Sequence, residues 1–170
     1  MPYKNILVAL DRTPASDRVF TYALDLAKRS QGQLRLVHSI PIKPYENLGE
    51  LLDAGVGLQS ATRVHHKEEA AHLHQVQAAQ QWLEELTAKA LKQNIAADFI
   101  CETTDPGLFI CQLAEAWAAD VIVMGSSGKK GLKKLILGSV SDYVTNHASC
   151  ETIVVPNDSH LEVEIFSQSS

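Results

Sequence analysis

The sequence predicts an α/β fold: a single domain built on an open, parallel, five-stranded sheet of the Rossmann-like kind, with helices on both faces. Short apolar runs alternate with longer segments whose apolar residues recur every three or four positions, as strands and amphipathic helices do. Such alternation favours parallel strands joined by right-handed crossovers. The length of 170 residues suits one domain, and the content of 45% hydrophobic and 21% charged residues is typical of globular proteins.

Five apolar runs are the predicted strands, because they are short and rich in Ile, Leu and Val. In chain order they are Asn5–Leu10, Gln33–Ile40, Ala96–Cys101, Val121–Met124 and Thr152–Val155. We expect the strand order 3-2-1-4-5, which reverses between the first and the fourth strand. Ligands of open α/β sheets bind at such a reversal, beyond the carboxyl ends of the strands.

Helical periodicity separates these strands. Thr13-Pro14 suits the start of the first helix, with Thr as its cap and Pro in its first turn. The second predicted helix is long and runs from Val64 to Gln93. Asp105-Pro106 caps and opens the third, and a short fourth helix is expected to begin near Ser139.

Two segments lack a clean period. Residues 41–63 contain several prolines and glycines, so we expect a long loop of the kind that often forms a lid or a contact. Residues 157–170 form a polar tail that is expected to add a weak edge strand or to be disordered. We therefore place the domain at residues 1–156, with the long loop inside it, and the tail at 157–170.

Composition excludes several classes of function. A net charge of −5 argues against nucleic-acid binding, which usually needs a basic surface. The three cysteines, Cys101, Cys111 and Cys150, form no close pair, so we expect no disulfide framework and interpret Cys101 and Cys111 as small core residues. No apolar run is long enough to span a membrane. The expected location is the cytoplasm.

A segment rich in glycine and serine follows the fourth strand. Gly125-Ser126-Ser127-Gly128 is separated by nine residues from Gly138-Ser139. Glycine lets the backbone approach a phosphate closely, and the amides at a helix N-terminus bind anions. The expected strand order brings this segment beside Asp11, at the end of the first strand. The sequence therefore predicts a phosphate-binding loop here.

The spacing differs from two better-known phosphate loops. A Walker A loop requires G-x-x-x-x-G-K-[ST], whereas Gly128-Lys129 is followed by Lys130. A dinucleotide fingerprint would place G-x-G-x-x-G after the first strand, but no glycine precedes Gly32.

The segment resembles the ATP-binding branch of the universal stress protein family, whose pattern is G-x2-G-x9-G-[ST]. Gly125, Gly128, Gly138 and Ser139 match every fixed position. The resemblance covers about Tyr3 to Pro156 and implies a protein that binds ATP, with Mg²⁺. By the resemblance, phosphates and ribose would meet the segment from Gly125 to Val140, adenine would meet the backbone of Ser39, and Asp11 would lie near the adenosine or the metal. The implied site residues are Ala9, Asp11, Ser39, Met124, Gly125, Gly128, Gly138, Ser139 and Val140.

The chain departs from that family pattern at three places. Ala9 stands where proline is common, Ser126-Ser127 where the second position is often histidine or arginine, and Thr104 where glycine is common. None of these changes removes a phosphate contact, although the serine change could alter affinity.

Plainer interpretations accompany several of these residues. Asp11 could serve only as a helix cap, and the four lysines 129, 130, 133 and 134 could form a solvated face. No two of the histidines 65, 66, 72 and 74 have the i, i+4 spacing of a helical zinc site, so we expect no metal there. We interpret His38, Trp82 and Trp117 as core residues.

Two classes of function follow. The resemblance implies a nucleotide-dependent regulatory protein of the stress response, which acts as a homodimer through the edge strand Thr152–Val155. A short apolar edge strand needs cover, although the tail could supply it. The alternative is a slow ATPase or an autophosphorylating enzyme. That alternative is weaker because phosphoryl transfer needs several placed groups, and Asp11 is the one carboxylate that the sequence places at the pocket. An interaction module that has lost nucleotide binding is a third possibility, against which the intact motif argues.

Overall fold

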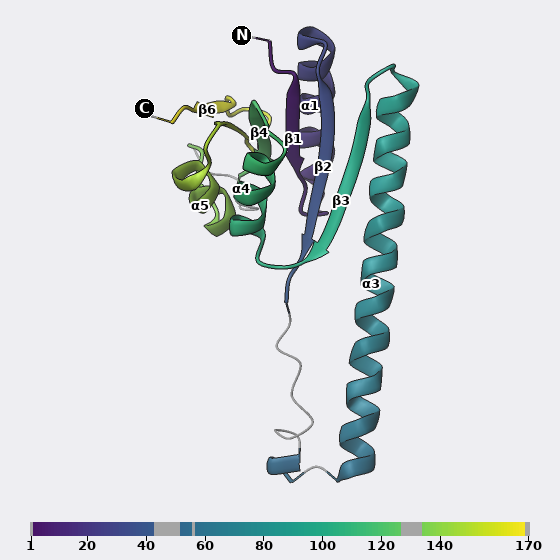
Figure 1. Cartoon of the computed structure of the whole chain (residues 1–170). Helices are drawn as coiled ribbons and strands as arrows, with labels where there is room; N and C mark the ends of the chain where they lie inside the picture. Colours follow the sequence, from purple (N-terminus) through teal and green to yellow (C-terminus); the bar gives the residue numbers. More distant parts are fainter. Residues whose placement is uncertain (1, 43–51, 56, 127–133, 169–170) are drawn as a thin grey trace.

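The computed structural model describes residues 2–42, 52–55, 57–126 and 134–168. Its core is one six-stranded sheet in the order β3-β2-β1-β4-β5-β6 (Figure 1). The strands are β1 Asn5–Ala9, β2 Gln33–Ile40, β3 Ala97–Thr103, β4 Val121–Gly125, β5 Glu151–Val155 and β6 Glu164–Phe166. The helices are α1 Ser16–Ser30, α3 Leu58–Lys92, α4 Pro106–Ala116 and α5 Ser139–His147. The predicted α/β class and the order 3-2-1-4-5 are confirmed.

Helices cover both faces of the sheet because successive side chains of a strand point to opposite faces. On one face Ile6, Val8 and Val123 pack with α1 and α3. On the other face Leu7 and Ile122 pack with α4 and α5. Figure 1 shows these two helical layers on either side of the strands. Strands buried on both faces explain the nearly continuous apolar runs in the sequence.

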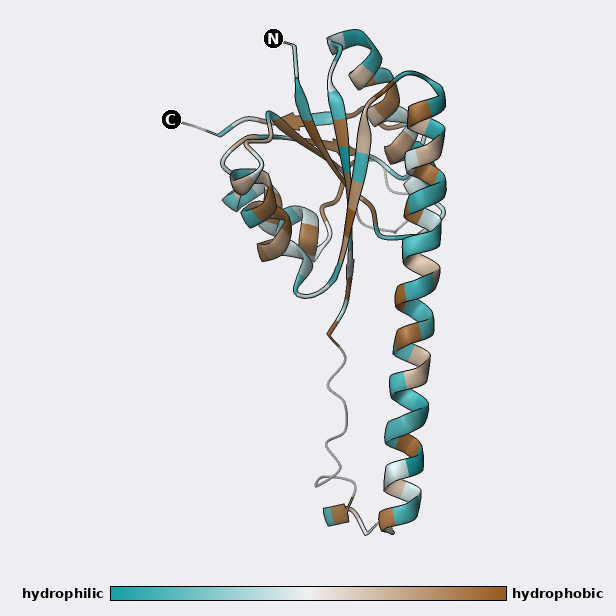
Figure 2. Cartoon of the chain, turned by 45° about the vertical axis from the view of Figure 1, so that its right-hand side comes forward, coloured by the Kyte–Doolittle hydropathy of each residue, from teal (hydrophilic) through white to brown (hydrophobic). Residues whose placement is uncertain are grey.

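Helix α3 is longer than the sequence predicted. It begins at Leu58 rather than Val64, so the end of the expected 41–63 loop is helical, whereas residues 43–51 and 56 lie outside the described residues. Its second half is anchored by buried apolar residues, namely Ala79, Leu83, Leu86 and Ala90. Its first half extends beyond the sheet and is largely polar (Figure 2). Periodicity failed to locate the start because this projecting half has little sheet to pack against.

One predicted cap is confirmed and another is wrong. Asp105 caps α4 by accepting a hydrogen bond from the Gly107 amide at 3.1 Å, and Pro106 opens the helix. The first helix begins at Ser16 instead of Pro14, and its N-cap residue makes no side-chain cap. The Thr13 hydroxyl instead donates to Asp11 Oδ1 at 2.8 Å. Because α1 begins only at Ser16, with Ala15 at its N-cap, Thr13 lies before the capping position.

The prediction that Thr152–Val155 is an edge strand is wrong. The tail returns along it, and β6 pairs antiparallel with β5 through Thr152↔Phe166, Ile153↔Ile165 and Val154↔Glu164. The expected homodimer through this edge would therefore require β6 to leave. The tail supplies the cover that the sequence analysis kept as the alternative.

Candidate functional site

A cavity of about 800 Å³ lies where the strand order reverses. It is bounded by the carboxyl ends of β1, β2 and β4, by the starts of α4 and α5 and by one residue of α3. The chain leaves β1 towards α1 on one face and leaves β4 towards α5 on the other, so the two backbones diverge above the sheet. The lining residues are Ala9, Leu10, Asp11, Arg12, Val37, His38, Ser39, Pro41, Gln75, Pro106, Ile110, Met124, Gly125, Ser126, Gly138, Ser139, Val140 and Ser141.

The structure brings most of the expected site residues together around this cavity. Those that line it are Ala9, Asp11, Ser39, Met124, Gly125, Gly138, Ser139 and Val140. Gly128 and the lysines 129, 130 and 133 lie outside the described residues. Lys134 is described; it is exposed and is not among the lining residues.

The N-terminus of α5 opens onto the cavity without a side-chain cap. Its N-cap is Gly138, whose φ of −78° and ψ of 177° are extended. The Gly138 carbonyl accepts from the Asp142 amide at 2.8 Å and from the Ser141 hydroxyl at 3.2 Å. Within the described part of the chain, the amides of Ser139, Val140 and Ser141 have no hydrogen-bond acceptor. Unpaired amides at a helix start form a site for an anion.

Asp11 holds the turn that leads from β1 to α1. Its Oδ1 accepts hydrogen bonds from the Thr13 amide at 3.3 Å, the Thr13 hydroxyl at 2.8 Å and the Ser16 hydroxyl at 3.1 Å. Asp11 therefore holds the turn before α1, and among the described residues no backbone amide of α1 is seen to donate to it, so the interpretation of Asp11 as a helix cap is not borne out. The same exposed residue also lines the cavity.

Arg12 continues this turn in an unusual backbone conformation. Its φ is +61°, in the left-handed region that costs a residue other than glycine on the order of 1 kcal/mol or more. Its guanidinium carbon lies 5.9 Å from the centroid of the Trp82 ring on α3. The turn thus directs a cation to the mouth of the cavity.

His38 and Ser39 alternate along β2 at the cavity wall. His38 is buried, its Nδ1 lies 2.7 Å from the Leu10 carbonyl, and its ring meets Trp82 edge-on at 5.6 Å. A carbonyl only accepts, so Nδ1 carries the proton, and the core interpretation of His38 is confirmed. The Ser39 hydroxyl is buried and has no hydrogen-bond partner within the described residues. A buried polar group without a partner costs about 1–3 kcal/mol, so Ser39 is suited to receive a ligand.

Sequence reasoning missed several lining residues. Arg12 was hidden because its position depends on a left-handed turn. Gln75 comes from α3 and lies one helical turn before the buried Ala79, so the inner stripe of that helix was the available signal. Pro106 and Ile110 of α4 complete an apolar wall. No pattern within a single segment indicates that these residues meet.

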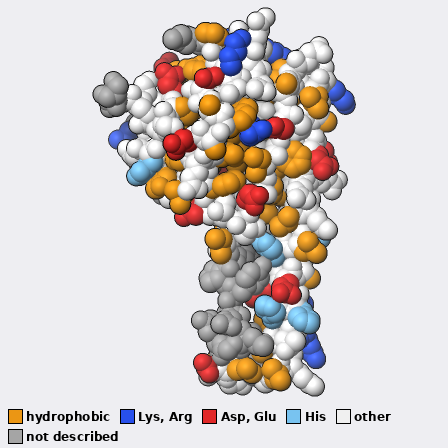
Figure 3. Space-filling view, viewed as in Figure 1, with side chains coloured by type: hydrophobic (Ala, Val, Ile, Leu, Met, Phe, Trp, Pro, Cys, Tyr) orange, Lys and Arg blue, Asp and Glu red, His pale blue; other side chains and the backbone are white. Residues whose placement is uncertain are grey.

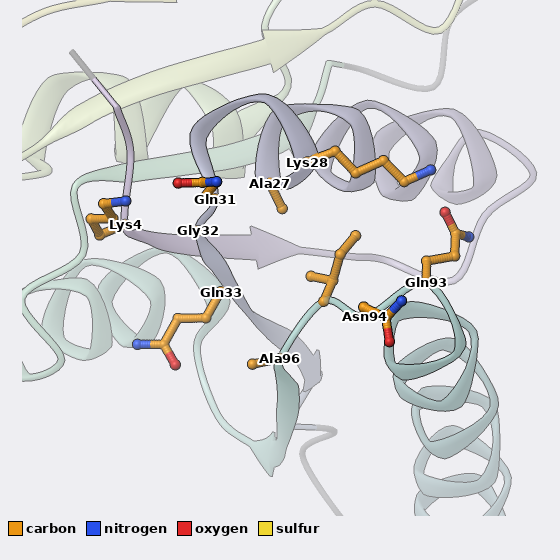
Figure 4. Close-up of a pocket in the computed structure, with 10 residues that line it drawn as sticks. Lys4, Ala27, Lys28, Gln31, Gly32, Gln33, Gln93, Asn94 and Ala96 are labelled. Carbon is orange, nitrogen blue, oxygen red and sulfur yellow. The ribbon is translucent and has the colours of Figure 1, made fainter.

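A second cavity, of about 540 Å³, lies at the opposite ends of the strands (Figure 4). It is lined by Lys4, Lys28 and several amide side chains, including Gln31 and Gln93. The Lys4 ammonium donates to the Ser30 carbonyl at the end of α1, at 3.2 Å. Cations at a helix C-terminus stabilise the helix. This role explains the position of Lys4, and no ligand in the cavity is needed to explain it.

The cysteines do not provide a nucleophile. Burial is the main cause that raises the pKa of Cys101 and Cys111, and it raises the pKa of Cys150 to about 11. A thiol that stays protonated near neutral pH is a poor nucleophile. The two expected core cysteines, Cys101 and Cys111, pack against the two apolar cores.

Histidines gather on the projecting part of α3 (Figure 3). His65 Nε2 lies 3.1 Å from Glu69 Oε1, and His72 Nε2 lies 3.2 Å from the Thr103 hydroxyl. Across the described ranges, no three His, Cys, Asp or Glu side chains form a group that could hold a metal ion. The described helices also include none that is long and apolar enough to cross a membrane.

Comparison with known proteins decides the family. The model of the universal stress protein family matches residues 2–156. The chain belongs to the universal stress protein family. A universal stress protein of Synechocystis sp. is 30% identical over 161 residues, which span 91% of this chain and 99% of the relative.

Solved universal stress proteins share the fold. UspA from Lactobacillus plantarum is 26% identical with a TM-score of 0.62, over 91% of this chain and 99% of that one. A universal stress protein from Arabidopsis thaliana with AMP bound is 20% identical with a TM-score of 0.56, over 92% and 94% of the two chains. Two others, each 18% identical, are complexes with dAMP and cAMP and have TM-scores of 0.55 and 0.59.

The two roles of Asp11 are separable by substitution. Asp11→Ala removes the acceptor of three hydrogen bonds and leaves the buried Ser16 hydroxyl unpaired. We expect the free energy of unfolding to fall by about 1–3 kcal/mol, the usual cost of leaving a buried polar group without a partner. Asp11→Asn keeps an acceptor oxygen and should retain most of the stability. Urea denaturation measures both; equal losses in the two variants would contradict the role of Asp11 as the acceptor that holds the turn.

Proposed function

We propose that this universal stress protein binds ATP, together with Mg²⁺, in the cavity between β1 and β4, and acts as a nucleotide-dependent regulatory protein of the stress response. The observation that carries the proposal is the start of α5, where three amides without an acceptor in the described part of the chain line a cavity at the reversal of the strand order. Both the helix dipole and the amides favour a negatively charged ligand at this point.

Each part of the nucleotide has a candidate partner. The phosphates would receive hydrogen bonds from the amides of Ser139 and Val140, with Gly125 and Gly138 leaving space for close approach and Gly128 closing the loop. The adenosine would take the orphaned Ser39 hydroxyl as a donor or acceptor. Met124, at the end of β4, and Ala9 would supply apolar contact at the floor.

Charge supports Mg²⁺ as part of the ligand. Among the described lining residues, Asp11 is the carboxylate and Arg12 the guanidinium. Asp11 Oδ1 is engaged in the turn, whereas no hydrogen bond involves Oδ2 within the described residues. Mg²⁺ is commonly bound by one or two carboxylates together with phosphates and water. One carboxylate therefore fits a metal that arrives with the nucleotide.

The relatives narrow the ligand class. AMP, dAMP and cAMP share an adenine and one phosphate, and each is named as the ligand of a solved universal stress protein. A volume of about 800 Å³ lies in the range of small-molecule sites, roughly 300–1,000 Å³. The proposal that ATP is preferred over these monophosphates rests on the G-x2-G-x9-G-[ST] motif, which resembles that of the ATP-binding branch of the family.

Replacement of Gly138 tests the proposal. Gly138→Val places a branched side chain beside the open amides of α5, and we expect ATP affinity to fall more than about tenfold, because a lost set of charge-assisted hydrogen bonds exceeds 1.4 kcal/mol. The sequence motif predicts the same for Gly128→Val. Calorimetry with Mg²⁺ and ATP measures the affinity, and circular dichroism checks the fold.

Gly57→Val is the matched control, because Gly57 is also an extended N-cap glycine, with open space around its Cβ position and away from the cavity. ATP should bind this variant as it binds the wild-type chain. An unchanged affinity in Gly138→Val would remove the start of α5 from the proposed site.

The Ser39 hydroxyl gives a second test, in which stability and ATP affinity should change in opposite directions. Ser39→Ala removes a buried hydroxyl without a partner, so the empty protein should unfold at equal or higher urea, whereas ATP affinity should fall by about three- to tenfold. Thr152→Val is the control, because the Thr152 hydroxyl is also buried without a partner but lies outside the cavity. Thr152→Val should leave ATP affinity unchanged. Equal affinity in both variants would exclude Ser39 from binding.

Turnover separates a regulatory protein from an enzyme. Phosphoryl transfer needs a positioned nucleophile, metal ligands and charge stabilisers, and the described lining contains one carboxylate, already engaged in the turn after β1. We expect steady-state assays with Mg²⁺ and ATP to show no hydrolysis above background. A clear kcat that Asp11→Ala abolishes would favour the slow ATPase instead.

A further inference from the structure

The cavity between β1 and β4 has two chemically different ends. One end is bounded by Gly125 and by the start of α5, where the phosphates of the proposed nucleotide would bind. The other end lies at β2, two strands away from β4 in the sheet, and it is lined by His38, Ser39 and Gln75. Neighbouring strands are about 4.8 Å apart, so the two ends are separated by about 10 Å. A nucleotide with its phosphates at the first end therefore places its base at the second.

Helix α3, which packs on β2 and β3, supplies Gln75 to this second end. Gln75 is half-buried and lies one helical turn before the fully buried Ala79, so it belongs to the stripe of α3 that faces the sheet. Within the described part of the chain, its side-chain amide makes no hydrogen bond. A carboxamide carries two N–H donors and an acceptor oxygen. Such an amide at a cavity wall is suited to a ligand that presents both a donor and an acceptor.

The same end of the cavity suits a flat ring. The Arg12 guanidinium carbon lies 5.9 Å from the centroid of the Trp82 ring, and the His38 ring meets that ring edge-on at 5.6 Å. Arg12 and His38 both line the cavity, and Trp82 follows Gln75 by two turns of α3. Nucleobases stack on guanidinium planes and on aromatic rings. The α3 side of the cavity thus offers a planar cation for the face of a base and an amide for its edge.

We propose that Gln75 is the residue that selects the base, through two hydrogen bonds to the edge of adenine. Its Oε1 accepts from the six-amino group, and its Nε2 donates to a neighbouring ring nitrogen. Glutamine pairs with adenine in this bidentate way in protein–DNA contacts, because the amine and N7 present a donor beside an acceptor. The inference rests on the proposed function, since it assigns the base end of that same site.

This pairing discriminates against guanine. Guanine carries a carbonyl oxygen where adenine carries the amine, so its O6 and N7 are both acceptors and leave the amide oxygen of Gln75 without a partner. A matched bidentate pair corresponds to a preference of roughly fivefold to a hundredfold. The Ser39 hydroxyl does not discriminate in this way, because a hydroxyl both donates and accepts. Gln75 is therefore better suited than Ser39 to set a preference for adenine.

The test compares ATP with the triphosphate of purine riboside, which lacks the six-amino group and keeps the ring nitrogens. Calorimetry with Mg²⁺ measures both affinities for the wild-type chain and for Gln75→Leu, in which an apolar side chain of similar size replaces the amide. The matched control is Gln77→Leu, because Gln77 lies on the same helix, is exposed and is not among the lining residues. Circular dichroism checks that both variants keep the helix content of the wild-type chain.

We expect the wild-type chain and Gln77→Leu to bind ATP about tenfold more tightly than the purine riboside triphosphate, because the amine gains one matched hydrogen bond in a partly buried site. Gln75→Leu should bind the two triphosphates with nearly equal affinity, since the amine then has no acceptor on α3. The measured quantity is the ratio of two affinities. A general disturbance of the site would weaken both ligands and leave that ratio unchanged.

Two results would overturn this inference and leave the proposed function in place. One is a wild-type chain that binds ATP without preferring it to the purine riboside triphosphate. The other is a Gln75→Leu variant that keeps the wild-type ratio; the acceptor would then be His38 Nε2, since Nδ1 donates to the Leu10 carbonyl. A wild-type chain that binds neither triphosphate would overturn the proposed function, and this inference with it.

Discussion

The divergence of the chain above β1 and β4 is the constraint on which the site depends. Right-handed crossovers send the segment after β1 to one face of the sheet and the segment after β4 to the other. The cavity opens beyond the paired strand ends Ala9 and Met124, and the start of α5 lines it. The cavity is therefore a property of the topology, and the residues at its rim determine what it binds.

Those residues are poorly satisfied in the empty protein. Among the described residues, the first amides of α5 have no acceptor and the Ser39 hydroxyl has no partner, and Arg12 occupies a left-handed backbone conformation. Each of these features costs free energy of folding, and they lie around one cavity. Unpaired polar groups and strained backbone are expected at a functional site, because these groups make their contacts with the ligand. The Asp11 turn limits the cost, because one carboxylate oxygen holds both Thr13 and Ser16 in place.

The sequence was informative where one segment determines its own structure. Strand β2 has the predicted bounds Gln33–Ile40, and Asp105 caps α4 as expected, because apolar runs and caps are local signals. The sequence did not predict features that form where distant segments meet. These are the pairing of the tail with β5, the start of α3 at Leu58 and the position of Gln75 at the cavity. Each of them depends on the assembled sheet. Thr13 misled because the chain makes a turn held by Asp11 before α1 begins at Ser16, so Thr13 lies two residues before the N-cap.

The length of α3 gives the cavity a mechanical connection to a remote surface. The helix is anchored through Ala79 and Leu83, touches the cavity at Gln75 and continues to Leu58 beyond the sheet. At 1.5 Å per residue the segment from Leu58 to Gln75 is about 26 Å long. A tilt of about 5° at the level of Gln75 would displace the far tip by about 2 Å, the scale on which helix shifts operate in allosteric proteins. A small rotation of α3 at the cavity wall would therefore become a larger displacement at the N-terminal end of this helix.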